Sequence, residues 1–452
     1  MASRLQKVLV ANRGEIAVRI IRAAHELGIQ AVAVHSTADR DSLAARLADE
    51  AVEIGPAHAT RSYLDPQAIL RAARDTGADS VHPGYGFLSE NAAFAAAVEE
   101  AGLVFVGPTP EAIRTMGDKA RARETARRAG VPVVPGSAGA LTGPDHAVAV
   151  AREIGFPVLV KACAGGGGRG IRIARDEKEL ARELAVAQAE AHAAFGDGGV
   201  YLERYIARAR HVEVQVLGDG KDVVHLYERE CSMQRRRQKI LEESPSPALS
   251  PEVREEICGS ATRLARAVGY RGAGTLEYLY DTDRGDFRFI EMNTRIQVEH
   301  PITEMVTGID LVREMLRIAG GEPLGLRQED IVPRGAAIEC RINAEDASRN
   351  FMPSPGVISE LCLPGGPGVR VDTLAYPGYA IPPYYDSLIA KLVVWAESRP
   401  AALARMRRAL REARVGGVPT TLALHRELLR STEMQTVDYD VNTLERWVAA
   451  RP

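Results

Sequence analysis

Short apolar runs alternate with longer amphipathic stretches over the first hundred or so residues of the chain. The apolar runs that predict strands are residues 8–11, 31–35, 51–54, 80–82 and 104–106. The stretch 15–27 has helical spacing of its apolar positions and stops at Gly28. Strands that alternate with helices are typical of a parallel, doubly wound sheet, which binds ligands at the carboxyl ends of its strands. The turn-like segments 12–14 and 82–87 follow two such ends.

Beyond residue 116 the pattern changes, and strand-like runs become longer. The further predicted strands are residues 157–161, 171–174, 200–205, 211–227 and 274–291. Helical spacing predicts helices over 177–195 and 401–412, and the stretch 421–429 closes the chain. At 452 residues the chain is too long for one hydrophobic core, so we expect about three domains.

The segment 287–300 has polar residues at every second position, with apolar residues between them. These positions are Glu291, Asn293, Arg295, Gln297 and Glu299. In an extended chain they would project to one side, about 6.6 Å apart. Carboxylate and amide oxygens suit hard cations such as Mg²⁺, and a guanidinium suits a planar anion. The pattern therefore predicts a metal beside an anion clamp, as nucleotide activation requires; the alternative is the solvated face of an edge strand.

A glycine run at 165–170 follows Lys161 on a predicted strand. It formally contains Gly-x-Gly-x-x-Gly, but a strand follows where a dinucleotide-binding fold needs a helix. It is not a P-loop, because Ile171 stands where the lysine should be. A strand–glycine loop–strand can close over phosphates with its backbone N–H groups, and the alternative is a flexible surface hairpin.

The basic run 234–239 contains Arg235, Arg236, Arg237 and Lys239 between glutamines. Alone, such a run is typical of a solvated patch or a nucleic-acid contact. Together with the alternating carboxylates it favours an anion site for phosphate or bicarbonate.

Composition narrows the class of protein. A formal net charge of −3 disfavours a main role in holding nucleic acid. The five cysteines are scattered, odd in number and never spaced Cys-x-x-Cys, which fits reduced thiols and offers no zinc site. We see no membrane-length apolar run and no room for a signal peptide before the first strand, so we expect a soluble cytoplasmic protein.

Seven motifs taken together resemble the biotin carboxylase family. They are residues 11–17 (ANRGEIA), 82–91, 116–119, 211–213, 230–236, 291–301 and 339–346. They follow one another in the family's order, and the resemblance extends from about residue 5 to residue 445. It implies an α/β protein of the ATP-grasp fold. The expected domains are a doubly wound, parallel-sheet pre-ATP-grasp domain (1–115), an ATP-grasp domain (116–330) with a mobile glycine-rich lid (about 134–205), and an α+β C-terminal domain (331–452).

The resemblance also implies a role for each matching residue. The implied ATP contacts are Lys119, Lys161, Gly167, Gly168, Glu203, Arg204, Tyr205, Ile206, His211, Glu277 and Glu291. The implied ligands of two Mg²⁺ or Mn²⁺ ions are Glu277, Glu291 and Asn293, and the implied bicarbonate and biotin contacts are Lys239, Arg295, Gln297, Val298, Arg341 and Tyr85. Arg237 stands where a histidine that contacts ATP is usual in the family, so we expect it to replace that contact.

The implied reaction is the carboxylation of biotin by ATP and bicarbonate through carboxyphosphate. Glu299 is the expected base for bicarbonate, Lys239 and Arg295 hold the anion, and Arg341 steadies the biotin enolate. Because the chain contains no Met-Lys-Met, we expect the biotin on a separate carrier protein. The resemblance further implies a carboxyltransferase partner, a homodimer, and the first half-reaction of acetyl-CoA carboxylase, which supplies malonyl-CoA for fatty-acid synthesis.

Three alternatives stay open on the sequence alone. The chain could serve a different acyl-CoA or pyruvate carboxylase, since the final acceptor is chosen by the transferase. It could be another ATP-grasp ligase that forms an acyl phosphate. A non-catalytic relative is disfavoured, because a degenerate copy would have lost some of Lys239, Glu291, Asn293, Arg295 and Glu299.

Overall fold

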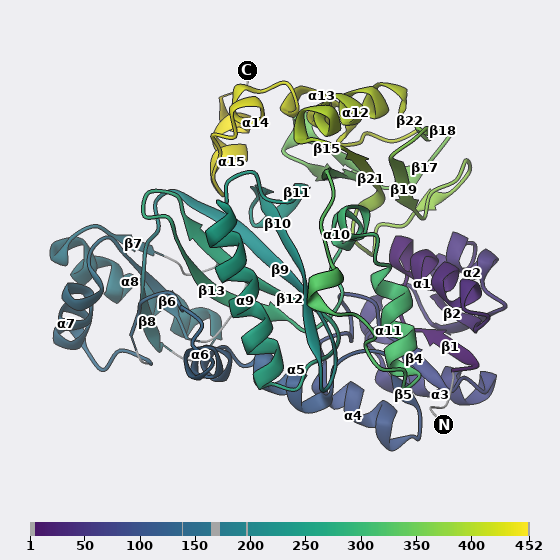
Figure 1. Cartoon of the computed structure of the whole chain (residues 1–452), viewed down its shortest axis with the longest axis horizontal. Helices are drawn as coiled ribbons and strands as arrows, with labels where there is room; N and C mark the ends of the chain where they lie inside the picture. Colours follow the sequence, from purple (N-terminus) through teal and green to yellow (C-terminus); the bar gives the residue numbers. More distant parts are fainter. Residues whose placement is uncertain (1–4, 138, 164–171, 196–197, 451–452) are drawn as a thin grey trace.

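The computed structural model describes residues 5–137, 139–163, 172–195 and 198–450 (Figure 1). Its first unit is a parallel sheet with strand order β3-β2-β1-β4-β5. The strands are β1 (Lys7–Val10), β2 (Gln30–Ser36), β3 (Glu50–Gly55), β4 (Ser80–His82) and β5 (Val104–Phe105). The helices are α1 (Gly14–Glu26), α2 (Leu43–Leu47), α3 (Pro66–Thr76), α4 (Ala92–Glu100) and α5 (Pro110–Gly117).

Successive residues of β1 face two different cores. Val8 and Val10 pack in a cluster with apolar residues of α1, whereas Leu9 packs in a cluster with those of α3 and α4. A sheet with helices on both faces buries both sides of its strands, which explains their nearly continuous apolar runs. The doubly wound parallel sheet predicted from the sequence is confirmed.

The two turns at the carboxyl ends of β1 and β4 hold each other. The Asn12 amide donates to the carbonyl oxygens of Pro83 and Tyr85, at 2.6 and 2.8 Å. Gly84 has a φ of +62°, and a Cβ there would meet the Asn12 amide at 2.9 Å. This close approach requires glycine, and it places the ring of Tyr85 beside Glu15, to which its hydroxyl donates.

A small antiparallel sheet with strand order β7-β6-β8 forms the unit at the left of Figure 1. Its strands are β6 (Val158–Ala162), β7 (Arg172–Ala174) and β8 (Val200–Arg204), and its helices are α7 (Pro144–Ile154) and α8 (Glu177–Phe195). Val158, Leu184 and Leu202 belong to a core of its own. This unit lies within the residues expected to form the lid, and the glycine run 165–170, including Gly167 and Gly168, lies outside the described residues.

The largest sheet has eight antiparallel strands in the order β13-β12-β9-β10-β11-β14-β21-β19. They are β9 (Ala209–Asp219), β10 (Val223–Arg235), β11 (Gln238–Ser244), β12 (Arg271–Asp281), β13 (Asp286–Asn293), β14 (Ala336–Asn343), β19 (Val369–Thr373) and β21 (Leu388–Ala396). Because β11 pairs with β14, this sheet continues from the ATP-grasp region into the C-terminal region. The sequence does not show this continuity.

Helices and short strands complete the chain. The helices are α6 (Lys119–Arg128), α9 (Pro251–Ala267), α10 (His300–Thr307), α11 (Leu311–Ala319), α12 (Arg399–Glu412), α13 (Leu422–Leu428), α14 (Thr432–Thr436) and α15 (Thr443–Ala449). The short strands are β15 (Glu345–Asp346), β16 (Met352–Pro353), β17 (Gly356–Val357), β18 (Glu360–Cys362), β20 (Ala380–Ile381) and β22 (Arg414–Gly416). No described helix combines the length and the apolar character that a membrane span requires.

The alternating segment 287–300 is not one extended strand, and this expectation is wrong. β13 ends at Asn293, and the chain then leaves the sheet and enters α10, whose N-cap is Glu299. The Thr294 N–H donates to a carboxylate oxygen of Glu90 at 3.1 Å rather than to a neighbouring strand. Pro301 in the first turn of α10 favours helix there, because its ring fixes φ and its missing N–H costs nothing at a helix start.

One buried lysine joins the N-terminal unit to the eight-stranded sheet. Lys391 on β21 is fully buried; its ammonium lies 3.0 Å from a carboxylate oxygen of Glu15 on α1 and 3.8 Å from one of Asp372 on β19. It also donates to the carbonyl oxygen of Val298 at 2.9 Å. The loop that carries the predicted site residues is therefore fixed from behind by this cation.

We expect Lys391→Met to lower the free energy of unfolding by about 3–5 kcal/mol, because buried Glu15 would lose its cation. Urea denaturation measures this change. The matched control is Lys7→Met, which removes the partly exposed ion pair with Glu50 and should cost less than about 1 kcal/mol. Equal costs for the two variants would contradict the structural role of Lys391.

Candidate active site

The ammonium of Lys239 on β11 lies among three carboxylates. It is 2.7 Å from a carboxylate oxygen of Glu299 and 3.1 Å from one of Glu277, and it also donates to Glu213. Burial opposes the ammonium form, but the three carboxylates outweigh burial and hold the pKa of Lys239 well above its usual value. Lys239 therefore stays charged and draws together side chains from three separate segments.

Two of these carboxylates, Glu213 and Glu277, belong to a row that crosses three neighbouring strands. Glu213 on β9 is directly opposite Glu277 on β12, and Glu277 is directly opposite Glu291 on β13. Like charges opposite each other in a sheet are destabilising. The row is stable because buried cations, above all Lys239, lie against it. The sequence analysis assigned no role to Glu213, although the motif 211–213 contains it.

A second buried cation, Arg229 on β10, was missed by the sequence analysis. Its fully buried guanidinium donates to Glu213 at 2.6 Å and to the side-chain oxygens of Gln215 and Gln297, each at 2.7 Å. It also donates to the hydroxyls of Thr303 and Thr275. The signal in the sequence was weak, because Arg229 lies between the predicted strand 211–227 and the motif 230–236, and a basic residue usually faces solvent.

The loop after β13 brings its polar side chains to the same place by folding rather than by extension. The side-chain amide of Gln297 donates to Glu277 at 2.9 Å, and its Oε1 accepts from Arg229. Arg295 donates to the Asn293 oxygen at 3.0 Å and to Glu90 at 2.8 Å. The structure therefore brings together the residues that the alternation indicated.

Glu299 lies between two cations. One oxygen accepts from Lys239, and the other accepts from Arg341 on β14 at 2.9 Å. Burial would raise the pKa of Glu299, but Lys239 and Arg341 outweigh burial and hold it below its usual value. The result is an ionised carboxylate that can accept a proton, held beside a guanidinium. The Tyr85 hydroxyl donates to Glu15, the carboxylate that pairs with Lys391 behind the loop.

The predicted metal ligands have the chemistry that a hard cation needs. Among the residues that the structure describes, the Glu291 carboxylate takes part in no hydrogen bond or ion pair. Burial and the charge of Glu277 raise the pKa of Glu291, which indicates an excess of negative charge at this point. Glu277, Glu291 and Asn293 on adjacent strands therefore fit a Mg²⁺ or Mn²⁺ ion, which would offset charge on a bound phosphate.

His211 on β9 lies beside this row. Its Nε2 is 3.2 Å from a carboxylate oxygen of Glu277 and 3.6 Å from one of Glu213. Burial opposes the charged ring, but Glu277 outweighs burial and raises the pKa of His211 to about 9. The imidazole is thus a cation at neutral pH, on the side where the resemblance predicts ATP.

The residues of the small sheet that are expected to contact ATP have different hydrogen-bond and ion-pair partners. Lys161 on β6 forms an ion pair with Glu203 on β8, and Arg123 of α6 pairs with the same carboxylate. The Arg204 guanidinium donates to the carbonyl oxygen of Ile154, at 2.9 and 3.1 Å, and so turns toward α7. Lys161, Glu203 and Arg204 therefore have partners within this unit and α6, and the ATP contacts expected for them stay predictions.

The other residues expected to contact ATP differ in their exposure. The Tyr205 N–H donates to the carbonyl oxygen of Pro157 at 3.0 Å, and Ile206 is buried. Lys119 is exposed at the start of α6, where its charge acts on Glu291.

Arg237 is not brought into the cluster. It is exposed at the tip of the β10–β11 hairpin, and within the described part of the chain its side chain has no hydrogen bond or ion pair. Arg236 and Arg237 have φ values of 48° and 66°, as the two central residues of a type I′ turn require. The turn geometry therefore directs the Arg237 side chain outward, and the ATP contact expected for it stays a prediction.

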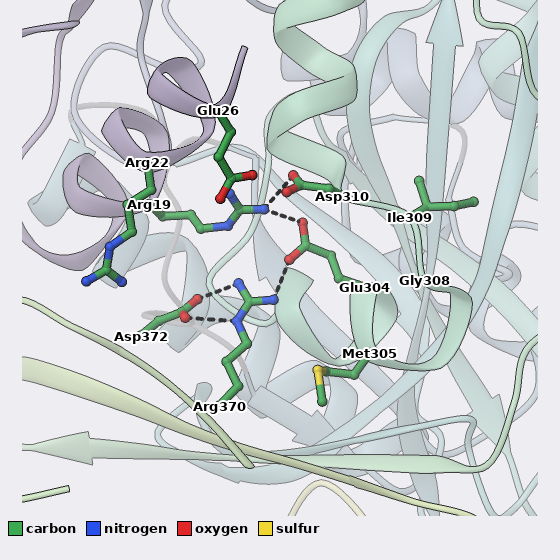
Figure 2. A pocket seen from close by; sticks show the side chains of 10 residues that line it. All are labelled: Arg19, Arg22, Glu26, Glu304, Met305, Gly308, Ile309, Asp310, Arg370 and Asp372. Carbon is green, nitrogen blue, oxygen red and sulfur yellow. Dashed lines mark hydrogen bonds and ion pairs between the residues drawn. The ribbon is translucent and has the colours of Figure 1, made fainter. Parts of the chain in front are cut away.

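A cavity of about 330 Å³ lies at the far end of α10 (Figure 2). Figure 2 shows Arg19 and Arg370 reaching Glu304 from two sides, at 3.0 and 2.6 Å, and Arg370 also pairs with Asp372. None of the predicted site residues lines this cavity. We place the active site at Lys239 instead, where acid, base and anion-binding groups converge.

The sequence matches three family profiles in order along the chain. Residues 4–113 match "Biotin carboxylase, N-terminal domain", residues 118–327 match "Carbamoyl-phosphate synthase L chain, ATP binding domain", and residues 339–446 match "Biotin carboxylase C-terminal domain".

Similar proteins and solved structures agree with these profiles. The chain is 55% identical over 444 residues to biotin carboxylase 1 of Bacillus subtilis, an alignment that covers 98% of this chain and 99% of that protein. It superposes with a TM-score of 0.91 and 49% identity, over 99% of both chains, on the biotin carboxylase domain dimer of Hydrogenobacter thermophilus 2-oxoglutarate carboxylase in complex with MgADP, ADP and bicarbonate. For the biotin carboxylase–β-γ-ATP complex from Campylobacter jejuni the TM-score is 0.92 and the identity 48%, over 98% of this chain and 99% of that one. The fold, the site and these similarities agree, and the chain belongs to the biotin carboxylase family of ATP-dependent ligases.

Proposed function

We propose that this chain uses MgATP and bicarbonate to carboxylate biotin held on a separate carrier protein, with each predicted site residue in its expected role. The observation that carries the proposal is Glu299, an ionised buried carboxylate fixed between Lys239 and Arg341. A base of this kind beside an anion clamp is what the activation of bicarbonate requires.

In the first step Glu299 accepts the proton of bicarbonate. The oxygen so exposed attacks the γ-phosphorus of ATP, ADP leaves, and carboxyphosphate forms. Lys239 and Arg295 offset the negative charge that gathers on the two anions, and Gln297 with the Val298 backbone orients the bicarbonate. Most of the catalysis is positioning and electrostatic stabilisation, as for other phosphoryl transfers. A divalent ion on Glu277, Glu291 and Asn293 supplies further positive charge to the phosphates when bound.

In the second step carboxyphosphate breaks into CO₂ and phosphate. The phosphate removes the N1 proton of biotin, Arg341 stabilises the enolate that results, and N1 attacks CO₂. Tyr85 would contact biotin, as the resemblance to the family implies. Carboxyphosphate reacts with water, so closure of the unit around β6, β7 and β8 over the nucleotide is part of the proposal.

Arg229 acts on this chemistry through other side chains. It fixes Gln297 and Glu213 simultaneously, and Glu213 in turn holds Lys239. A planar guanidinium can satisfy these partners in one plane, whereas an ammonium on a flexible stem cannot. We therefore assign Arg229 as a positioning residue of the bicarbonate pocket.

The proposal extends to assembly. We infer that the chain acts as a homodimer in the cytoplasm, with a biotin carboxyl carrier protein and a carboxyltransferase as partners, and that acetyl-CoA is the final acceptor. The support is the family itself, together with the domain dimer named for the Hydrogenobacter thermophilus structure.

Glu299→Gln keeps the size of the side chain but removes the base. We expect biotin carboxylation to fall by about 10²–10⁴-fold while the affinity for ATP stays within about threefold. Steady-state carboxylation and equilibrium binding of ATP measure the two quantities. The control is Glu111→Gln on the exposed face of α5. A parallel loss of binding and turnover would make Glu299 structural instead.

For Arg229→Lys we expect the KM for bicarbonate to rise at least tenfold. Gln297 and Glu213 each lose a hydrogen bond from the charged guanidinium, and such a bond is worth about 1.5–3 kcal/mol. The KM for ATP should change much less. Arg263→Lys on the exposed side of α9 is the matched control. An equal rise in both KM values would show general damage rather than a positioning role.

Biotin on a carrier should be a far better substrate than free biotin, because tethering raises its effective concentration. The measurement compares kcat/KM for free biotin with that for a separately prepared biotinylated carrier, after the chain itself is probed with streptavidin. Biotin found covalently on this chain, or equal use of both substrates, would end the separate-carrier proposal.

A further inference from the structure

Two buried carboxyl groups next to Arg341 have no role in the mechanism above. Glu242 on β11 is directly opposite Glu339 on β14, and both side chains are fully buried. Opposite residues of an antiparallel pair lie on the same face with Cβ atoms about 4.5–5.5 Å apart, so the two carboxyl groups are neighbours. Two ionised carboxylates at this position would repel each other in a medium of low dielectric constant.

The hydrogen bonds around the pair are incomplete. One oxygen of Glu242 accepts from Nε of Arg341 at 2.6 Å. The other oxygen of Glu242 and both oxygens of Glu339 have no hydrogen-bond partner within the described chain. Polar atoms buried in this way are costly unless a donor is supplied. A proton shared between Glu339 and Glu242 would give two of these three oxygens a partner.

The charged groups that face the pair are already engaged with other partners. Arg341 is shared with Glu299, Lys391 pairs with Glu15, and Lys239 is surrounded by Glu213, Glu277 and Glu299. These cations lie on β11, β14 and β21, and Glu299 lies in the loop before α10. Among the described residues, none of these three cations forms an ion pair with Glu339.

We propose that Glu339 is a protonated acid that donates its O–H to the free oxygen of Glu242, and that this carboxyl pair positions the Arg341 guanidinium for its work on biotin. The shared proton is a property of the fold, whereas the biotin part of the inference rests on the proposed function. Glu339 and Glu242 are positioning residues, since they act through Arg341.

The electrostatics of the pair agree with this geometry. Burial raises the pKa of Glu242 to about 7; the Arg341 charge opposes this shift, and the Glu299 charge adds to it. Burial and the Glu242 charge raise the pKa of Glu339 well above its usual value, although Lys391 and Arg341 oppose them. Glu339 binds its proton more tightly in the folded state than in the unfolded state. The stability linked to Glu339 is therefore present at low pH and is lost as pH rises toward its folded pKa.

The pair matters most after the first step of the reaction. Before it, Arg341 is held by two carboxylates, Glu299 and Glu242. When Glu299 has taken the bicarbonate proton it is neutral, and its hold on the guanidinium weakens. Glu242 is then the remaining ionised anchor, and the proton on Glu339 is what allows Glu242 to stay ionised. Arg341 thus keeps its place for the biotin step.

The first experiment detects the proton itself. Infrared spectra of the full-length chain at pH 7.5 should contain the C=O stretch of a protonated carboxylic acid that shifts in D₂O and is lost in Glu339→Gln. Val393→Ala, which changes the buried neighbour opposite Glu339 on β21, should retain the band. A spectrum of Glu339→Gln identical to that of the unchanged chain would overturn the protonated state. This readout does not depend on any enzymatic activity.

The second experiment tests the effect on Arg341. The amide of Glu339→Gln still donates to Glu242, whereas Glu339→Leu has a similar volume and no donor. We expect Glu339→Leu to lower the ratio of biotin carboxylation to bicarbonate-dependent ATP cleavage by about tenfold, as the loss of one buried hydrogen bond implies. Glu339→Gln should keep the ratio within about threefold of Val393→Ala, which serves as the packing control.

Equal ratios for Glu339→Gln and Glu339→Leu would overturn the positioning role. Melting temperatures give an independent check, because Glu339→Gln removes the proton linkage. Its Tm relative to the unchanged chain should rise between pH 6 and pH 9, and a constant difference would contradict the buried proton. If the unchanged chain does not carboxylate biotin, the proposed function fails, while the infrared and melting results still decide whether the carboxyl pair holds a proton.

Discussion

The site depends on one buried ammonium, that of Lys239, in contact with three carboxylates. Glu213, Glu277 and Glu299 come from β9, β12 and the loop before α10, and they would repel one another without it. A buried ion pair gives little net stability, because desolvation of the charges offsets their attraction. Its main effect is geometric, since only one arrangement of the three segments satisfies the cation. Lys239 thereby fixes where the base, the metal ligands and the bicarbonate pocket lie relative to each other.

Further buried cations extend this constraint to the rest of the molecule. Arg229 holds the side chain of Gln297. Lys391 holds the Val298 backbone and pairs with Glu15 of the N-terminal unit. Arg341 joins Glu299 to Glu242 on the C-terminal side of the large sheet. Because these cations lie on β10, β11, β14 and β21, the continuity of the sheet is what brings sequence-distant regions to one active site. The charge network and the sheet therefore depend on each other.

Much of this arrangement could be predicted from the sequence where the signal is local. The parallel sheet followed from apolar strands that alternate with helices, and the residues between Glu291 and Glu299 were identified by their spacing. The same spacing gave the wrong conformation beyond Asn293, because Glu90 binds the Thr294 N–H and Pro301 favours a helix start. The residues converge by folding of a loop, which periodicity cannot distinguish from a strand.

Other parts could not be predicted because their partners are far away in the sequence. Arg229 and Gln297 are 68 residues apart, and Arg341 and Glu242 are 99 apart. Without the pairing of β11 with β14, nothing in the local sequence around Glu339 distinguishes a buried acid from an exposed one. Arg237 shows another limit: its exposure follows from the turn between β10 and β11, which requires positive φ, and the ATP contact that the family pattern implies stays a prediction.

The central claim is that this site activates bicarbonate by making one of its oxygens a nucleophile toward the γ-phosphorus of ATP. The most direct test uses bicarbonate labelled with ¹⁸O in all its oxygens, with unlabelled ATP, water and biotinylated carrier. Mass spectrometry of the inorganic phosphate should find a single ¹⁸O transferred from bicarbonate, with the other two in the carboxybiotin. Phosphate free of the label would contradict the account, because the bond to phosphorus would then have been made by water or another nucleophile.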